Sequence, residues 1–302
     1  PAGGIPGEDD DILIELLAEV YGLITGPPAW RKSLLTKFDE LGFKRHPLAP
    51  CVVLKYEGDK LCGLIVTETD DLLGGGITDS FHEAVKELRR HFTFGKWVNL
   101  QTESCEYGGR SLRQNPDFSV TISMVRYLKQ KAREIILPRG RCKQPDEEAT
   151  EMEITAFRGL LGKLNWATRE GMPNGSGDAS LLSGKLPHPK VRDLQEANAA
   201  LRRLLQAEAT ITIRSIPLER IRLVVVSDAS LGNASGGNSQ LAHLIGAADE
   251  SILCGEEADF SLLCYKSHCM GRAASSTLMV EANALSEGLA EAEYVATWIG
   301  LA

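Results

Sequence analysis

Two adjacent carboxylates, Asp70 and Asp71, have the clearest chemical potential in this sequence. An apolar run at 61–67 precedes them and a glycine cluster at 74–76 follows. Residues that favour β-structure, closed by glycines, predict a strand, a turn and a second strand with both aspartates at the bend. Two like charges side by side repel each other unless a cation neutralises them. Because Mg²⁺ binds carboxylate and phosphate oxygens together, the pair indicates a metal-dependent phosphoryl-transfer site, with an acidic β-turn as the alternative.

A second pair of carboxylates lies near the other end of the chain. Asp228 follows the apolar run 223–226, and Glu281 lies in a helix predicted to follow three strands. In a unit of three strands and a helix, an acid at a strand end and an acid on the packing helix can approach each other and share a metal. The alternative for each residue is a solvated surface acid.

A basic stretch at 126–143 stands out because the whole chain has a net charge of −8. Seven cationic residues are opposed there only by Glu134, which gives the stretch a local excess of positive charge. They are Arg126, Lys129, Lys131, Arg133, Arg139, Arg141 and Lys143. A basic surface on an acidic protein is a candidate contact for nucleic-acid phosphates, although a solvated helix face beside a charged linker has the same composition.

Length and composition bound the class of protein. A chain of 302 residues is long enough for two domains, and it begins with Pro1 and stops within an apparent helix, so we interpret it as a fragment. Its seven cysteines are scattered, which favours a reducing compartment over a disulfide framework. The close group Cys264, His268 and Cys269 lacks a second ligand pair at zinc spacing and is interpreted as structural. Without an apolar span or leader, we expect an intracellular location, cytoplasmic or nuclear, and no membrane partner.

Hydrophobic periodicity predicts an α+β fold. Helices are expected at about 9–23, 28–41, 80–92, 120–133, 155–168, 190–207 and 276–298, with Ser80 and Glu83 as a capping box. Strands are expected at 51–56, 61–67, 101–106, 109–113, 221–226, 240–245 and 260–265. The segment 171–189 is rich in Gly, Pro and Ser and is predicted to be a loop, apart from the short Leu181-Leu182 pair.

Four short stretches, in order along the chain, carry a resemblance to a known family. They are Val20-Tyr21-Gly22-Leu23 with Pro28-Ala29-Trp30, then Thr69-Asp70-Asp71-Leu72-Leu73, then Phe157-Arg158-Gly159-Leu160-Leu161 with Trp166, and finally Ser227-Asp228-Ala229 with Ser276-Thr277 and Glu281-Ala282. In this order they resemble the palm entry, polymerase box, connector and RNase H segments of copia-type LTR-retrotransposon polyproteins.

The resemblance implies a partial reverse-transcriptase palm at 1–115, a helical thumb and connector at 116–215, and an incomplete RNase H-like unit at 216–302. It implies RNA-directed DNA synthesis from dNTPs on a template-primer, with Asp70 and Asp71 as Mg²⁺ ligands in a two-metal site. Asp228 and Glu281 would hold metal for cleavage of RNA in an RNA–DNA hybrid. The basic stretch would lie near the thumb, where a duplex passes.

The sequence also departs from the family's pattern. Glu68 stands two residues before Asp70, where the family prefers an aromatic residue. A third palm aspartate is expected upstream of Pro1 and a further RNase H aspartate downstream of Ala302, so both sites are incomplete and we expect the chain alone to be inactive. The alternative is a decayed or domesticated remnant that binds nucleic acid without catalysis.

Overall fold

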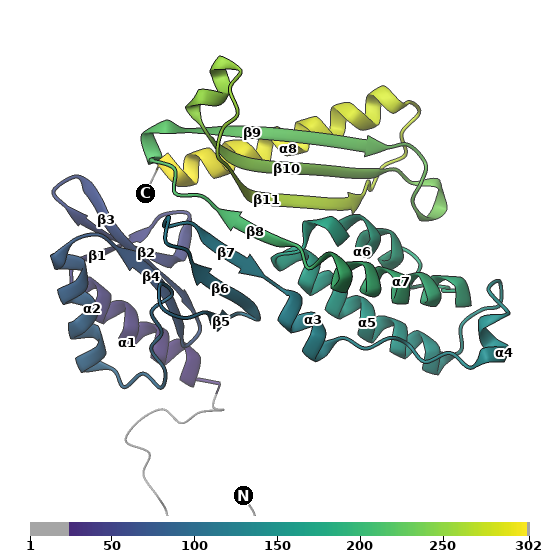
Figure 1. Ribbon diagram of the computed structural model, residues 1–302, viewed down its shortest axis with the longest axis horizontal. Helices are drawn as coiled ribbons and strands as arrows, with labels where there is room; N and C mark the ends of the chain where they lie inside the picture. The colour runs from purple at the N-terminus through teal and green to yellow at the C-terminus, as the bar shows by residue number, and fades with distance from the viewer. Residues whose placement is uncertain (1–23, 301–302) are drawn as a thin grey trace, which may run out of the picture. The chain divides into compact units, whose positions relative to one another are not determined.

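The computed structural model describes residues 24–300, and the helix expected at 9–23 lies outside them (Figure 1). The fold is α+β, as predicted. Contacts divide the chain into two compact units, described over 24–95 and 96–300. The three-part division with boundaries after 115 and 215 stays a prediction. Within the described residues, no helix combines the length and apolarity needed to cross a membrane.

Unit one is an antiparallel sheet with two helices. Its strands are β1 (Phe43–His46), β2 (Ala49–Glu57), β3 (Lys60–Glu68) and β4 (Asp71–Gly76), and they pair in sequence order. Its helices are α1 (Gly26–Glu40) and α2 (Asp79–His91). Sequential strands joined by short turns form a meander, and the predicted strands at 51–56 and 61–67 are confirmed within β2 and β3.

Phe81 seats α2 on this sheet. Its ring is 4 % exposed and lies against Gly63 and Gly76, which face each other in the β3–β4 register. The N-cap of α2 is Thr78, whose hydroxyl accepts from the backbone N–H of Phe81, so the predicted capping box of Ser80 and Glu83 is wrong. The helix begins earlier than predicted, and this start places Phe81 over the two glycines.

Unit two begins with a second antiparallel sheet, in the order β5 (Cys105–Tyr107), β6 (Arg110–Gln114), β7 (Val120–Ser123) and β8 (Thr210–Ile213). Helices connect β7 to β8: α3 (Val125–Lys131), α4 (Arg139–Cys142), α5 (Glu151–Glu170), α6 (Ser176–Ser183) and α7 (Val191–Ala207). A core of buried Leu, Ala, Met and Phe side chains from α3, α5, α6 and α7 joins them, with Phe157, Leu164 and Leu194 fully enclosed.

Two predictions in this region are wrong. The segment 120–133 is a strand followed by a shorter helix, because Val120–Ser123 pairs with both β6 and β8. The segment 171–189, predicted to be a loop, contains α6, whose Ala179 and Leu182 are buried. Val120, Thr121 and Ile122 themselves favour a strand, which pairing on both sides completes, whereas α6 forms because its apolar residues join the core.

The last part of unit two is a three-stranded sheet with one helix across it. The strands β9 (Ile221–Ser230), β10 (Gln240–Asp249) and β11 (Phe260–Cys269) are ordered β11-β10-β9, and α8 (Thr277–Gly300) contacts β9 and β10 (Figure 1). The predicted strands and helix are confirmed. A stripe of small buried residues on α8 includes Gly288, where an added Cβ would stand 3.0 Å from Val225 and 3.2 Å from His243. The helix therefore approaches the strand backbones closely.

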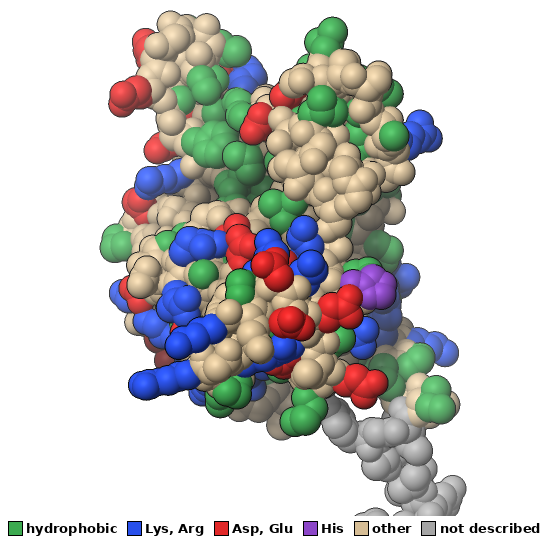
Figure 2. All heavy atoms as spheres, turned by 90° about the vertical axis from the view of Figure 1, so that its right-hand side faces the viewer, with side chains coloured by type: hydrophobic (Ala, Val, Ile, Leu, Met, Phe, Trp, Pro, Cys, Tyr) green, Lys and Arg blue, Asp and Glu red, His purple; other side chains and the backbone are tan. Residues whose placement is uncertain are grey.

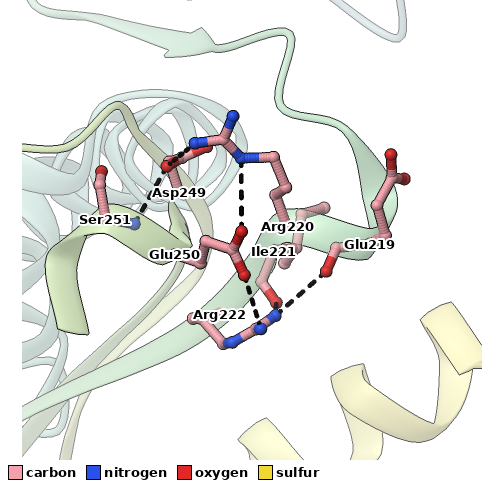
Figure 3. A network of polar contacts seen from close by, with 7 residues as sticks. All are labelled: Glu219, Arg220, Ile221, Arg222, Asp249, Glu250 and Ser251. Atoms are coloured by element: carbon pink, nitrogen blue, oxygen red, sulfur yellow. Dashed lines mark hydrogen bonds and ion pairs between the residues drawn. The ribbon is translucent and has the colours of Figure 1, made fainter. Parts of the chain in front are cut away.

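A charged network holds β9 and β10 in register at one end (Figure 3). Arg220 lies 2.7 Å from Asp249, and Arg222 lies 2.9 Å from Glu250. The backbone N–H of Ser251 and the Arg220 guanidinium both donate to Asp249 and lower the pKa of its carboxyl group. These side chains remain partly exposed, so we expect each pair to contribute modestly to stability. Asp228 lies towards the opposite end of β9.

Candidate functional site

Asp70 and Asp71 lie at the tip of the β3–β4 hairpin, as predicted. Glu68 at the end of β3 pairs with Asp71 at the start of β4, which leaves Thr69 and Asp70 as a two-residue turn. Strand β2 lies alongside β3. Both aspartates are exposed, so their carboxylates are accessible to solvent and to ligands. The strands around the turn anchor it, because Cys62 and Ile65 of β3 are buried in the core of unit one and Leu72 of β4 packs against that core.

The turn contains an uncommon backbone conformation. Thr69 has φ = 56°, in the left-handed region that β-branched residues rarely adopt. Two-residue hairpin turns need a positive φ at the first central position, where glycine is the usual choice. The carbonyl of Thr69 accepts a hydrogen bond of 2.9 Å from the indole N–H of Trp30, on the second turn of α1. In the sequence Trp30 stands out only within the Pro28-Ala29-Trp30 stretch, and its local pattern contains no signal for this contact.

The tip of the hairpin carries carboxylate oxygens that could bind a metal, and across residues 24–300 no ion pair with a cationic side chain balances its negative charge. Glu68, Asp70 and Asp71 are all exposed, and within the described residues neither aspartate side chain forms an ion pair or a hydrogen bond. Exposed carboxylates without cationic partners suit a hard divalent cation such as Mg²⁺. The part of the chain that the structure describes contains no group of three or more His, Cys, Asp or Glu residues arranged to hold a metal. Two aspartates by themselves would supply only part of the oxygen ligands that such a cation takes.

The second pair of carboxylates has a different arrangement. Val225 and Ala229 contact α8, and the pairing of β9 with β10 is regular between them. Because side chains alternate along a strand, Asp228 points to the face of the sheet that α8 does not cover. Glu281 is half-buried on α8. That these two carboxylates share a metal stays a prediction.

Two histidines lie under α8 and bind its acidic residues. His243 of β10 is 1 % exposed, and its Nε2 lies 2.9 Å from Glu291. His268 of β11 lies 3.1 Å from Glu287 in the same way. Burial lowers the pKa of His268, and its neighbour Lys266 lowers it further. His268 therefore belongs to a contact between the helix and the sheet, consistent with the structural interpretation of its cluster with Cys264 and Cys269.

The basic stretch is distributed over several elements. Arg126, Lys129 and Lys131 lie on α3, Arg133 follows it, and Arg139, Arg141 and Lys143 lie on or next to α4. Lys129 forms an ion pair with Glu208, and Arg126 lies 3.9 Å from Glu106. Figure 2, which views the end of unit two where α4 lies, shows Lys and Arg side chains interspersed with Asp and Glu. Acidic partners therefore offset part of the positive charge seen in the sequence.

A shallow depression of about 520 Å³ lies beside α3. Arg126, Lys129 and Gln130 line one side of it, together with Ser123 and Thr210 from the adjacent strands. These groups are hydrogen-bond donors to phosphate oxygens, although Glu208 shares the depression. Among the residues predicted to contact nucleic acid, Arg126 and Lys129 line this depression.

Arg141 is held within the structure by other residues. Its guanidinium donates to both carboxylate oxygens of Glu153, at 3.0 and 2.9 Å, and to the carbonyl of Glu148. Glu153 also accepts from the backbone N–H of Thr150 and completes the capping box of α5. The Arg141 and Glu153 side chains are 18 % and 14 % exposed. Their mutual contact therefore satisfies most of the donors that Arg141 could offer to a phosphate.

We expect Glu153→Gln to lower the free energy of unfolding by about 2 kcal/mol at pH 7, after discounting for partial exposure. The hydrogen bonds from Arg141 lower the pKa of Glu153 from 4.5 to about 2. Because the folded pKa is depressed, this stabilisation is complete above pH 4.5 and is lost as the pH falls towards 2. Urea unfolding at pH 7 and at pH 3 measures it, with the exposed Glu151→Gln on the same helix as control. An equal loss in both variants at pH 7 would contradict the assignment.

Comparison with known proteins gives one curated relative. No protein-family model matches the chain, and no solved structure matches it. The chain is similar to the Saccharomyces cerevisiae protein named "Putative transposon Ty5-1 protein YCL074W", with 25 % identity over 248 residues. The match covers 77 % of this chain and 77 % of the relative. The chain is thus similar over most of its length to a protein named for a transposon.

Proposed function

We propose that this chain is part of a retrotransposon reverse transcriptase, an RNA-directed DNA polymerase, joined to an RNase H segment. The observation that carries the proposal is the exposed Asp70–Asp71 pair at the tip of an antiparallel hairpin backed by two helices. The similarity to a transposon protein supports a retrotransposon origin. The sheet of β9, β10 and β11 with α8 would be the RNase H segment, with Asp228 and Glu281 as its acidic residues.

Asp70 and Asp71 would hold Mg²⁺ through their carboxylate oxygens. When bound, the metal would neutralise charge on the nucleotide phosphates and on the attacking 3′ hydroxyl oxygen. The contribution of this chain is positional, because a two-residue turn between paired strands holds both carboxylates at one tip. Glu68 adds a third negative charge beside them, which increases the mutual repulsion of the carboxylates until a cation binds.

The nucleic-acid contact would use the depression beside α3. Arg126, Lys129 and Gln130 would contact phosphate oxygens of the template-primer without reading its sequence. Arg133, Arg139, Lys131 and Lys143 are exposed and would add long-range attraction that salt screens. Arg141 would contribute least, because Glu153 and Glu148 occupy its donors.

Metal binding at the turn tests the proposal directly. Mn²⁺ added together with dTTP is expected to broaden the amide resonances of 68–73, since triphosphate oxygens and the two carboxylates would complete one coordination shell. The double substitution Asp70→Asn and Asp71→Asn is expected to raise the apparent dissociation constant for this broadening at least about tenfold.

Asp59→Asn is the matched control, because Asp59 is also an exposed aspartate in a hairpin turn of unit one. It is expected to leave the broadening at 68–73 unchanged. Broadening that dTTP does not enhance, or that survives the double substitution, would identify the pair as an ordinary acidic turn and refute the proposed site.

A further inference from the structure

The turn that carries Asp70 contains two unfavourable features. Thr69 adopts a left-handed backbone conformation, which is costly for a residue with a branched Cβ. Glu68 and Asp71 stand directly opposite each other, and like charges in that position destabilise a strand pair. A hairpin tip with both features is prone to open or fluctuate unless a contact from another element holds it.

Trp30 supplies such a contact from 39 residues away in the sequence. Its indole N–H donates to the Thr69 carbonyl at 2.9 Å. The Trp30 ring is itself fixed, because it packs edge-on against Phe92 at the end of α2, with the ring centroids 4.9 Å apart. Pro27 and Pro28 begin α1 just before it and restrict the backbone there. The donor is therefore presented to the turn from a rigid support.

The neighbouring residue on α1 contacts the same end of the sheet. The Arg31 guanidinium donates to the Pro50 carbonyl at 3.3 Å, and Thr67 donates to the Cys51 carbonyl at 3.2 Å. The second turn of α1 thus binds the start of β2 as well as the tip of the β3–β4 hairpin. The contact between α1 and the acidic turn is made at the Thr69 carbonyl.

A fixed carbonyl at Thr69 constrains the aspartates that follow it. The peptide group that contains this carbonyl joins Thr69 to Asp70 and is planar, so holding its oxygen also restricts the direction in which the Asp70 backbone leaves the turn. The carboxylate positions follow from that direction and from the rotamers of two short side chains. When the carboxylates are already ordered, metal binding loses less conformational entropy, and the affinity is higher.

We infer that Trp30 is the positioning residue of the Asp70–Asp71 pair and acts by fastening the Thr69 carbonyl. The inference rests on the proposed function, because it assigns the acidic pair to metal binding. It adds a residue that does not contact the metal and lies far from the pair in sequence. It predicts that the affinity of the turn for metal depends on the indole N–H group of Trp30.

Trp30→Phe removes the donor and keeps an aromatic ring against Phe92. The apparent dissociation constant of Mn²⁺ with dTTP at the turn is expected to rise about fivefold, the change that corresponds to one net hydrogen bond. The amide order parameters of Thr69, Asp70 and Asp71 are expected to fall without metal, while the free energy of unfolding falls by no more than the net contribution of that one hydrogen bond. Trp166→Phe in unit two is the matched control and should alter neither quantity.

A second variant covers the case in which Trp30→Phe disturbs packing. Incorporation of 3-benzothienylalanine at position 30 keeps the shape of indole and lacks the N–H group. If both variants bind Mn²⁺ as tightly as the unmodified chain and keep an ordered turn, the positioning role is refuted while the metal site stands. If the unmodified chain shows no Mn²⁺ broadening at the turn, the proposed function fails. In that case, a loss of turn order in both variants would still support the fastening of Thr69, and unchanged order would refute it.

Discussion

Primer extension on an RNA template is expected to require both Asp70 and Asp71. Replacing either aspartate by asparagine removes a charged metal ligand and should lower dTTP incorporation on poly(rA)·oligo(dT) with Mg²⁺ at least about a hundredfold. The resemblance to copia-type polyproteins implies that further aspartates complete the site. Two proteins are therefore assayed in parallel: the 302-residue chain, and a longer chain that also includes the residues encoded by any adjoining sequence.

Asp59→Asn is again the control and is expected to keep full incorporation, since it changes the same charge in another exposed turn of unit one. Incorporation that persists in both Asp70→Asn and Asp71→Asn would place the catalytic carboxylates elsewhere. Template-primer binding without any synthesis, even in the extended chain, would favour the non-catalytic remnant over the polymerase.

Gly63→Ala is expected to lower the free energy of unfolding of unit one by about 3 kcal/mol, because the core has no room for a methyl group there. A Cβ at position 63 would stand 2.2 Å from the Phe81 ring, and one at Gly76 would stand 2.3 Å from it. Phe81 is buried in the core with Phe38 and Leu88 and cannot move outward without exposing apolar area. Urea unfolding of the full chain, followed through amide resonances of unit one, measures the loss.

Gly75→Ala on β4 is the control for this prediction. A Cβ at Gly75 would meet no atom within 4 Å, so we expect a change below about 0.5 kcal/mol. Phe81→Leu combined with Gly63→Ala should cost less than the sum of the two single substitutions, because the smaller side chain relieves the overlap. Strict additivity, or an equal effect of Gly75→Ala, would show that the overlap with Phe81 does not cause the loss of stability in Gly63→Ala.

Local patterns were sufficient for the elements that bury one continuous face. The hairpin around Asp70 and Asp71, the three strands with α8, and α7 all appear where the sequence predicts them. In the helices apolar residues recur at the helical period, and in the strands a run of β-forming residues ends at turn residues, so the sequence alone indicates the type of each element. The exposed position of the two aspartates follows as well, because a tight turn between buried strands projects from the sheet.

Segments with weak local preference needed their tertiary partners. Val120–Ser123 becomes β7 because it pairs with β6 and with β8, which lies beyond five helices in the sequence. The Gly- and Ser-rich segment that contains α6 is helical where Ala179 and Leu182 join the core. Strand pairing and burial between residues far apart contribute more free energy than these short segments' own propensities.

The sequence by itself determined the α+β class, the acidic hairpin and the order of the resembling segments. Only the tertiary structure decided that Arg141 is bound by Glu153, that Asp228 points away from α8, and that Trp30 fastens Thr69. A local pattern encodes which face of an element is buried. The partner of a charge or an N–H group, in contrast, can lie on another element and is known only from the folded chain. The sequence gives the number of Lys and Arg residues. Whether one of them can bind a phosphate depends on which carboxylate lies beside it in the folded chain.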